Sequence, residues 1–95
     1  MNKFEAVLLI SPEVSNAQLK KELENFDNIL NANNGNIINN EDWGLRDLSY
    51  KIKNFKKAFY NFFQLEIDGR KIEIIKNNLS QNDLLLRHLF IKVKK

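Results

Sequence analysis

Hydrophobic residues alternate with a period of two in several separate segments of the chain, which is the pattern of β-strands. Residues 3–10, 59–67 and 84–93 show this alternation, and residues 37–52 show it at their far end. Apolar residues occupy both sides of residues 3–10 and 59–67, as is typical of strands in the middle of a sheet. The sequence therefore predicts four strands, of which the first and third are central.

Two other segments have the spacing of amphipathic helices. In residues 19–30, leucine and phenylalanine recur every three or four positions, and charged residues lie between them. Ser15 is suited to cap the start of this helix, and the Asn-rich stretch before Gly35 is suited to end it. Residues 72–79 repeat the pattern over a shorter length. The sequence thus predicts one long and one short helix.

The resulting order is β-α-β-β-α-β, which favours an α+β fold of the ferredoxin-like type with a single domain over residues 1–95. Right-handed crossovers place both helices on one face of a four-stranded antiparallel sheet, with the strand order 4-1-3-2. The other face is left without helices. A large exposed apolar patch on such a face is typical of a contact surface. We expect this open face to carry Val7, Leu9, Tyr60, Phe62, His88 and Phe90.

The second predicted strand is interrupted between Glu41 and Gly44. A glycine inside a strand indicates either a β-bulge or a close approach of another backbone. Trp43, the only tryptophan, either anchors a protein partner or covers the sheet edge beside the bulge. Tyr50 alternates with apolar neighbours and is expected in the core, and residues 53–57 are expected to form a turn.

The composition offers little for catalysis. The chain has no cysteine and a single histidine, His88, which excludes disulfides, thiol chemistry and a histidine metal cluster. An acylphosphatase-like enzyme would need an anion-binding loop after the first strand, but residues 11–14 contain neither arginine nor glycine. We therefore expect no enzyme, no cofactor and no small-molecule substrate. No apolar stretch reaches the roughly 18 residues of a membrane span, so a soluble cytoplasmic protein is expected.

Charge is distributed unevenly along the chain. The net charge is +3, but residues 1–50 carry four basic against eight acidic residues, while residues 51–95 carry eleven against four. The second half is therefore a candidate surface for a polyanion, or else a solvated lysine-rich surface. Only three of the fifteen basic residues are arginines. Because arginine forms a planar fork that matches phosphate and carboxylate, their positions are informative: Arg46, Arg70 and Arg87.

One function class open to this fold is the single-stranded RNA-binding module. Such modules stack bases on aromatic side chains of the third strand, next to basic residues. Residues 57–63 have a loosely similar composition, but Ala58 stands where that signature has glycine, and the first strand lacks a matching aromatic residue. This stand-alone RNA binder, using Tyr60 and Phe62, is kept as the alternative hypothesis.

Residues 41–52 carry a more specific pattern, Trp-Gly-x-Arg-x-Leu-x-Tyr-x-Ile, from Trp43 to Ile52. It resembles the signature of the bacterial small-subunit ribosomal protein six family, and the resemblance extends over about residues 3 to 93. Many members of that family have proline where Lys51 stands here. The resemblance implies a structural, ribosome-bound protein that binds the central domain of small-subunit rRNA together with the eighteenth small-subunit ribosomal protein.

The site residues follow from this resemblance combined with the charge pattern. Arg46 and Arg87 fall on positions that match the family, and each would bind rRNA phosphate or pair with an acid such as Asp47 or Glu41. Basic side chains at the hairpin tip and at the C-terminus are candidate phosphate contacts. The expected rRNA or partner contacts are Arg46, Arg87, Lys53, Lys56, Lys57, Lys92 and Lys94. The expected partner-interface residues are Trp43, Tyr60, Phe62 and Phe90.

Overall fold

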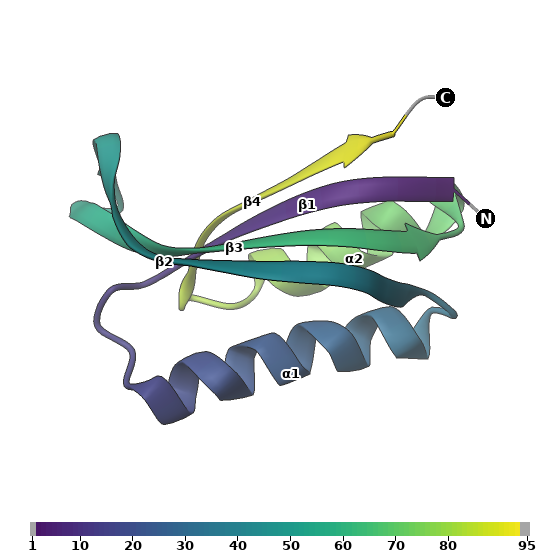
Figure 1. Cartoon of the computed structure of the whole chain (residues 1–95), viewed down its shortest axis with the longest axis horizontal. Helices are drawn as coiled ribbons and strands as arrows, with labels where there is room; N and C mark the ends of the chain where they lie inside the picture. The colour runs from purple at the N-terminus through teal and green to yellow at the C-terminus, as the bar shows by residue number, and fades with distance from the viewer. Residues whose placement is uncertain (1, 94–95) are drawn as a thin grey trace.

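A computed structural model describes residues 2–93, and its elements follow one another in the predicted order (Figure 1). The strands are β1 (Asn2–Ile10), β2 (Asn36–Ile52), β3 (Phe55–Ile67) and β4 (Leu85–Lys92). The helices are α1 (Asn16–Ala32) and α2 (Ile72–Ser80), the latter preceded by a short 3₁₀ helix, η1 (Gly69–Lys71).

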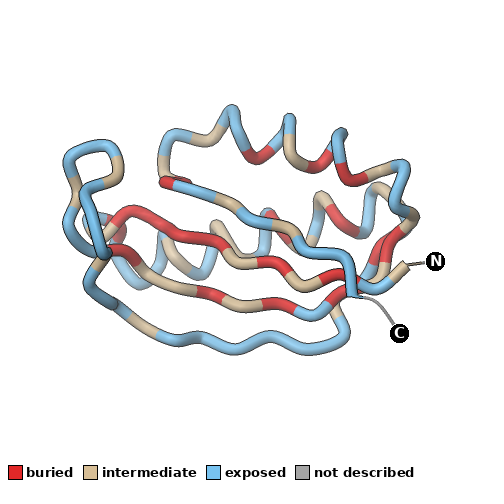
Figure 2. Tube along the Cα trace, turned by 90° about the horizontal axis from the view of Figure 1, so that it is seen from above, coloured by how far each residue is buried: buried red, intermediate tan, exposed pale blue. Residues whose placement is uncertain are grey.

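All four strands pair antiparallel in the order β2-β3-β1-β4, so the predicted strand order is confirmed. Ala6 in β1 shows the register, since it lies opposite Phe63 of β3 and Phe90 of β4. Figure 2 shows that buried positions concentrate in the central strands, whereas the edge strand β2 is largely exposed. β1 and β3, which carry apolar residues on both sides, are therefore the central strands, as the sequence predicts.

Both helices cover the same face of the sheet, and their apolar side chains form the main core with it. The Phe26 ring of α1 lies 4.8 Å from the Phe63 ring of β3, tilted by 54°. We call this set of buried residues the helix-face core: Phe4, Ala6, Leu8, Ile10, Val14, Phe26, Leu30, Phe63, Leu65, Ile67, Ile72, Ile75, Leu79 and Leu85.

Helix α1 begins at the cap expected from the sequence. Gln18 N–H donates to the Ser15 hydroxyl over 3.2 Å, and Ser15 N–H donates to the Gln18 side-chain carbonyl over 3.0 Å. This reciprocal pair is a capping box. After the helix, Asn34 takes the left-handed conformation with φ of 63°. Gly35 lies where space is short, because a Cβ there would lie 2.9 Å from the Ile67 side chain and 3.1 Å from the Glu66 carbonyl oxygen.

The β2–β3 hairpin differs from the expected turn at residues 53–57. Only Lys53 and Asn54 form the turn, with φ of 50° and 69°, and β3 begins at Phe55. Two consecutive positive φ values are typical of a tight two-residue hairpin turn. Gly44 has φ of 75° and open space around its Cβ position, so it marks a bulge and not a close backbone approach. The end of the hairpin bends away from the helices (Figure 1).

Candidate nucleic-acid and protein interface

The face of the sheet opposite the helices, the open face, carries a second and smaller apolar cluster. Leu9, Ala58 and Leu86 are buried there, from β1, β3 and β4 respectively. We call these three residues the open-face cluster. Side chains from the sheet and from the hairpin pack against it: Val7, Leu48, Ile52, Phe55 and Tyr60. The predicted positions of Val7, Leu9 and Tyr60 on the open face are therefore confirmed.

The prediction that His88 and Phe90 lie on the open face is wrong. His88 is opposite Leu8 and Phe90 is opposite Ala6, and both partners belong to the helix-face core. The Phe90 ring lies 6.4 Å from the Phe26 ring of α1. Burial lowers the pKa of His88, and the charge of Lys76 lowers it further.

A β-bulge in β4 explains the error. Leu9 pairs with Arg87, but the next residue, Ile10, pairs with Leu85, so Leu86 is an extra residue in the ladder. One extra residue moves every later side chain to the opposite face. The open face therefore receives Leu89 and Ile91, each 52% exposed, in place of His88 and Phe90.

The bent hairpin is attached to the sheet by polar contacts as well. Arg87 Nη1 of β4 donates a hydrogen bond to the Tyr50 hydroxyl of the hairpin over 3.1 Å, and the guanidinium carbon lies 5.9 Å from the centre of the Tyr50 ring. Lys53 Nζ donates to the Leu85 carbonyl over 3.4 Å. Tyr50 is 62% exposed, so its expected place in the core is wrong; the bend of the hairpin carries it out of the apolar layer.

Trp43 lies in a bulge of β2 and stacks on Phe62 of β3. The two rings are 5.4 Å apart and nearly parallel, at 6°. The indole N–H donates to the Glu41 carboxylate over 2.9 Å. Arg46 Nε donates to the Trp43 carbonyl over 2.9 Å, and its guanidinium carbon lies 5.7 Å from the indole centre. Trp43 thus covers Phe62 and remains 39% exposed itself.

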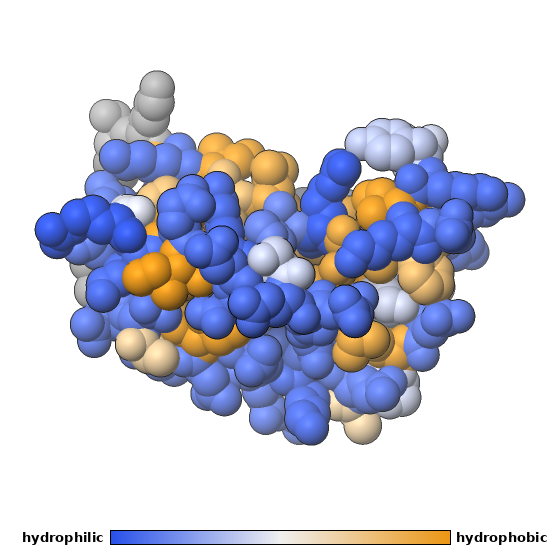
Figure 3. Space-filling view, turned by 180° about the vertical axis from the view of Figure 1, so that it is seen from behind, coloured by the Kyte–Doolittle hydropathy of each residue, from blue (hydrophilic) through white to orange (hydrophobic). Residues whose placement is uncertain are grey.

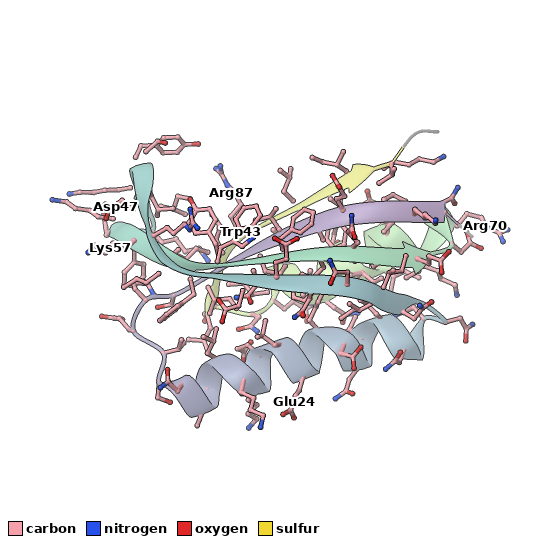
Figure 4. All side chains as sticks on the ribbon, in the orientation of Figure 1. Glu24, Trp43, Asp47, Lys57, Arg70 and Arg87 are labelled. Carbon is pink, nitrogen blue, oxygen red and sulfur yellow. The ribbon has the colours of Figure 1, made fainter. Side chains whose placement is uncertain are left out.

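The three arginines have different surroundings. Arg70, on η1, makes a paired contact with Asp68, with Nη2 to Oδ2 at 2.7 Å. These hydrogen bonds lower the pKa of Asp68 to about 2 and raise the pKa of Arg70. Arg46 and Arg87 form no ion pair with any carboxylate of residues 2–93. In Figure 4, Arg87 and Trp43 project on the side of the sheet opposite α1, while Arg70 lies at the far end.

The predicted lysine contacts lie in two places. Lys53, Lys56 and Lys57 are exposed around the hairpin tip, and Lys57 lies 3.8 Å from Asp47. Lys92 is exposed at the end of β4, while Lys94 lies outside the described residues. The hairpin therefore brings three basic side chains to the same end of the molecule as Arg87, but Lys92 lies at the opposite end of its strand.

An apolar strip follows the outer part of the open face along β4. It consists of Leu89, Ile91 and Val93, all exposed. Beside it, a hollow of about 160 Å³ lies between the strand ends and is lined in part by Ile38 and Val93. Seen from behind, the molecule shows apolar patches separated by hydrophilic side chains (Figure 3). The alternation of β4 could have located this strip, had its bulge been visible in the sequence.

Among residues 2–93, no group of three or more His, Asp or Glu side chains could hold a metal ion. No helix of the described chain is long and apolar enough to cross a membrane.

The fold and the open face together define a class: a ferredoxin-like α+β protein whose uncovered sheet face combines aromatic, apolar and arginine side chains, the mixture found where macromolecules are in contact. The family model described as ribosomal protein S6 matches residues 3–92. This chain belongs to the ribosomal protein S6 family, a family of the small ribosomal subunit.

Individual relatives agree with this assignment. Small ribosomal subunit protein bS6 of Rickettsia felis is 39% identical over 92 residues, which cover 97% of this chain and 76% of the relative. The protein of the same name from Pelagibacter ubique is 37% identical over 95 residues, covering 100% and 78%. The crystal structure of 30S ribosomal protein S6 from Thermotoga maritima superposes with a TM-score of 0.92 at 22% identity, over 97% of this chain and 87% of that one, so it shows the same fold.

Proposed function

We propose that this protein is a structural constituent of the small ribosomal subunit that binds the central domain of small-subunit rRNA together with the eighteenth small-subunit ribosomal protein. It acts in the cytoplasm, bound to the ribosome. Membership of the ribosomal protein S6 family supports the first part of this proposal. The second part depends on the chemistry of the open face.

The observation that carries the proposal is the pair Arg46 and Arg87. Both are exposed, and neither forms an ion pair within residues 2–93. An arginine without a carboxylate partner, next to an exposed ring, has the chemistry that binds RNA phosphate. The hairpin lysines Lys53 and Lys56 extend this basic end of the molecule.

The protein partner fits a different part of the same face. Leu89, Ile91 and Val93 form an exposed apolar strip on β4. A strip of this kind gains stability when another protein removes it from water. RNA phosphate offers no apolar surface to cover it, so we assign the strip to the partner and the arginine-bearing end to rRNA.

The alternative, a stand-alone binder of single-stranded RNA, requires open aromatic platforms at Tyr60 and Phe62. The Trp43 indole is stacked on Phe62, and Tyr60 packs against the open-face cluster. Side chains of this chain therefore partly cover both rings, which counts against the stand-alone alternative.

The test is a binding titration of the purified chain on a central-domain rRNA fragment, with and without the eighteenth protein. We expect weak binding of the chain alone and strong binding of the pair, with affinity that falls steeply as salt rises, because phosphate contacts release counterions. Equal affinity with and without the partner contradicts the cooperative part. A second measurement is the co-sedimentation of the chain with small ribosomal subunits. If the chain does not sediment with them, the proposal as a whole is contradicted.

A further inference from the structure

Two of the three arginines are held in place by aromatic residues of β2 through the same combination of contacts. Arg46 and Arg87 each have the guanidinium carbon within 6 Å of a ring centre, Trp43 and Tyr50 respectively. Each also donates one hydrogen bond to the residue that carries the ring. A guanidinium held over an aromatic face keeps its charge and loses much of its rotational freedom.

We propose that Trp43 and Tyr50 are positioning residues that hold Arg46 and Arg87 in the orientation in which they bind RNA phosphate. This inference rests on the rRNA binding proposed above. It assigns the aromatic rings of the signature segment a role toward the arginines, in addition to any contact with a protein partner.

The hydrogen bonds leave the phosphate-binding edges open. Arg87 uses only Nη1, toward Tyr50, so its Nε and Nη2 have no partner among residues 2–93. Arg46 donates only through Nε, toward the Trp43 carbonyl, so neither of its Nη groups has a partner among residues 2–93. Arg70 differs, because Asp68 occupies both its Nε and Nη2. Two free N–H groups on one planar fork suit two oxygens of one phosphate.

The Tyr50 contact also helps to hold the hairpin against the sheet. Tyr50 belongs to the bent hairpin, whereas Arg87 belongs to β4, 37 residues further along the chain. Their hydrogen bond, together with that of Lys53 to Leu85, attaches the hairpin to the sheet. The same contact that orients Arg87 therefore also brings the hairpin lysines to the arginine end of the open face.

The experiment is a double-mutant cycle on the central-domain rRNA fragment with the eighteenth protein present. Arg87→Ala should weaken binding about tenfold, the loss expected for one bidentate phosphate contact. Tyr50→Phe, which removes only the hydroxyl, should weaken it about threefold. In the Arg87→Ala background Tyr50→Phe should change nothing further, because two residues that act as one unit are not additive.

The chain supplies a matched control in Arg70, whose guanidinium is paired with Asp68. Arg70→Ala makes the same chemical change as Arg87→Ala at an arginine whose phosphate-binding edge is already occupied, and should leave rRNA affinity unchanged. The same cycle with Trp43→Leu and Arg46→Ala tests the second pair. Thermal unfolding of each variant, free of RNA, verifies that the fold persists.

Three outcomes are decisive. Wild-type affinity in Tyr50→Phe overturns the inference while the proposed rRNA binding stands. Additive effects of Tyr50→Phe and Arg87→Ala also overturn it, since Tyr50 would then contribute independently of Arg87. No binding by the wild-type pair overturns the proposed function, and this inference with it.

Discussion

The two faces of the sheet are built from the same central strands but carry different amounts of buried apolar surface. The helix-face core contains fourteen buried residues, whereas the open-face cluster contains three. Alternate residues of β1 and β3 contribute to both the helix-face core and the open-face cluster. One period-two pattern thus gives a face that stabilises the fold and a face that remains available for contact.

The polar chemistry of the two faces differs as well. Arg46, Arg87 and Tyr50 lie on the open side, where they are exposed. On the helix side, Asn61 is fully buried, and neither of its side-chain polar atoms has a hydrogen-bond partner among residues 2–93. The comparison therefore predicts that substitutions of buried residues change stability, most of all on the helix side, whereas substitutions of exposed open-face residues change mainly binding.

The largest expected effect is at the centre of the helix-face core. Phe63→Ala removes a ring that is 1% exposed and packs on Phe26. The cavity and the lost transfer energy should lower the free energy of unfolding by about 3–5 kcal/mol. Urea unfolding followed by circular dichroism measures it. A loss below about 1 kcal/mol would mean that the helix face does not dominate stability.

A smaller effect is expected in the open-face cluster. Leu86→Ala should lower the free energy of unfolding by about 2 kcal/mol, at the lower end of the range for leucine, because the cluster has few buried members. Amide exchange should accelerate first in the hairpin that packs on Leu86. Uniform acceleration across all four strands would show that the two faces are one cooperative unit.

The general fold could be predicted because its signals are local. Alternation identified β1 and β3, helical spacing identified α1 and α2, and Ser15 marked the first cap. The face assignments of His88 and Phe90 could not be read in this way. They depend on one extra residue, Leu86, in the β4 ladder, and whether a bulge forms there depends on pairing with β1.

The candidate site was predictable by residue type more than by arrangement. Arg46, Arg87 and Trp43 stood out because arginine and tryptophan are rare in the chain. That Tyr50 would contact Arg87 was not predictable, because the bend of the hairpin, with its register shifts between Asp47 and Ile52, brings together residues 37 positions apart.

A third prediction concerns Asn61, a polar side chain that is fully buried in the helix face. Asn61→Leu replaces an amide that has no partner among residues 2–93 by an apolar group of similar size. Because a buried polar group without a partner is costly, this change should raise the free energy of unfolding by about 1 kcal/mol. The same urea titration tests it. A destabilised variant would show that the amide is needed where it lies.

The smallest expected effect lies outside both faces, at the ion pair of η1. The hydrogen bonds and charge of Arg70 lower the pKa of Asp68 from 3.8 to about 2. A carboxyl with a depressed pKa stabilises the fold above its unfolded pKa and loses that contribution as the pH falls through the folded value. Stability should therefore decline between pH 3.8 and about 2, and Asp68→Asn should reduce this part of the decline. Because the pair is exposed to solvent, the effect should be smaller than that of either core variant. Urea midpoints of the wild type and of Asp68→Asn, measured across this pH range, give the size of this effect, and Asp83→Asn is the control. A change as large as that of Leu86→Ala would show that the ends of the sheet contribute as much to stability as its open face.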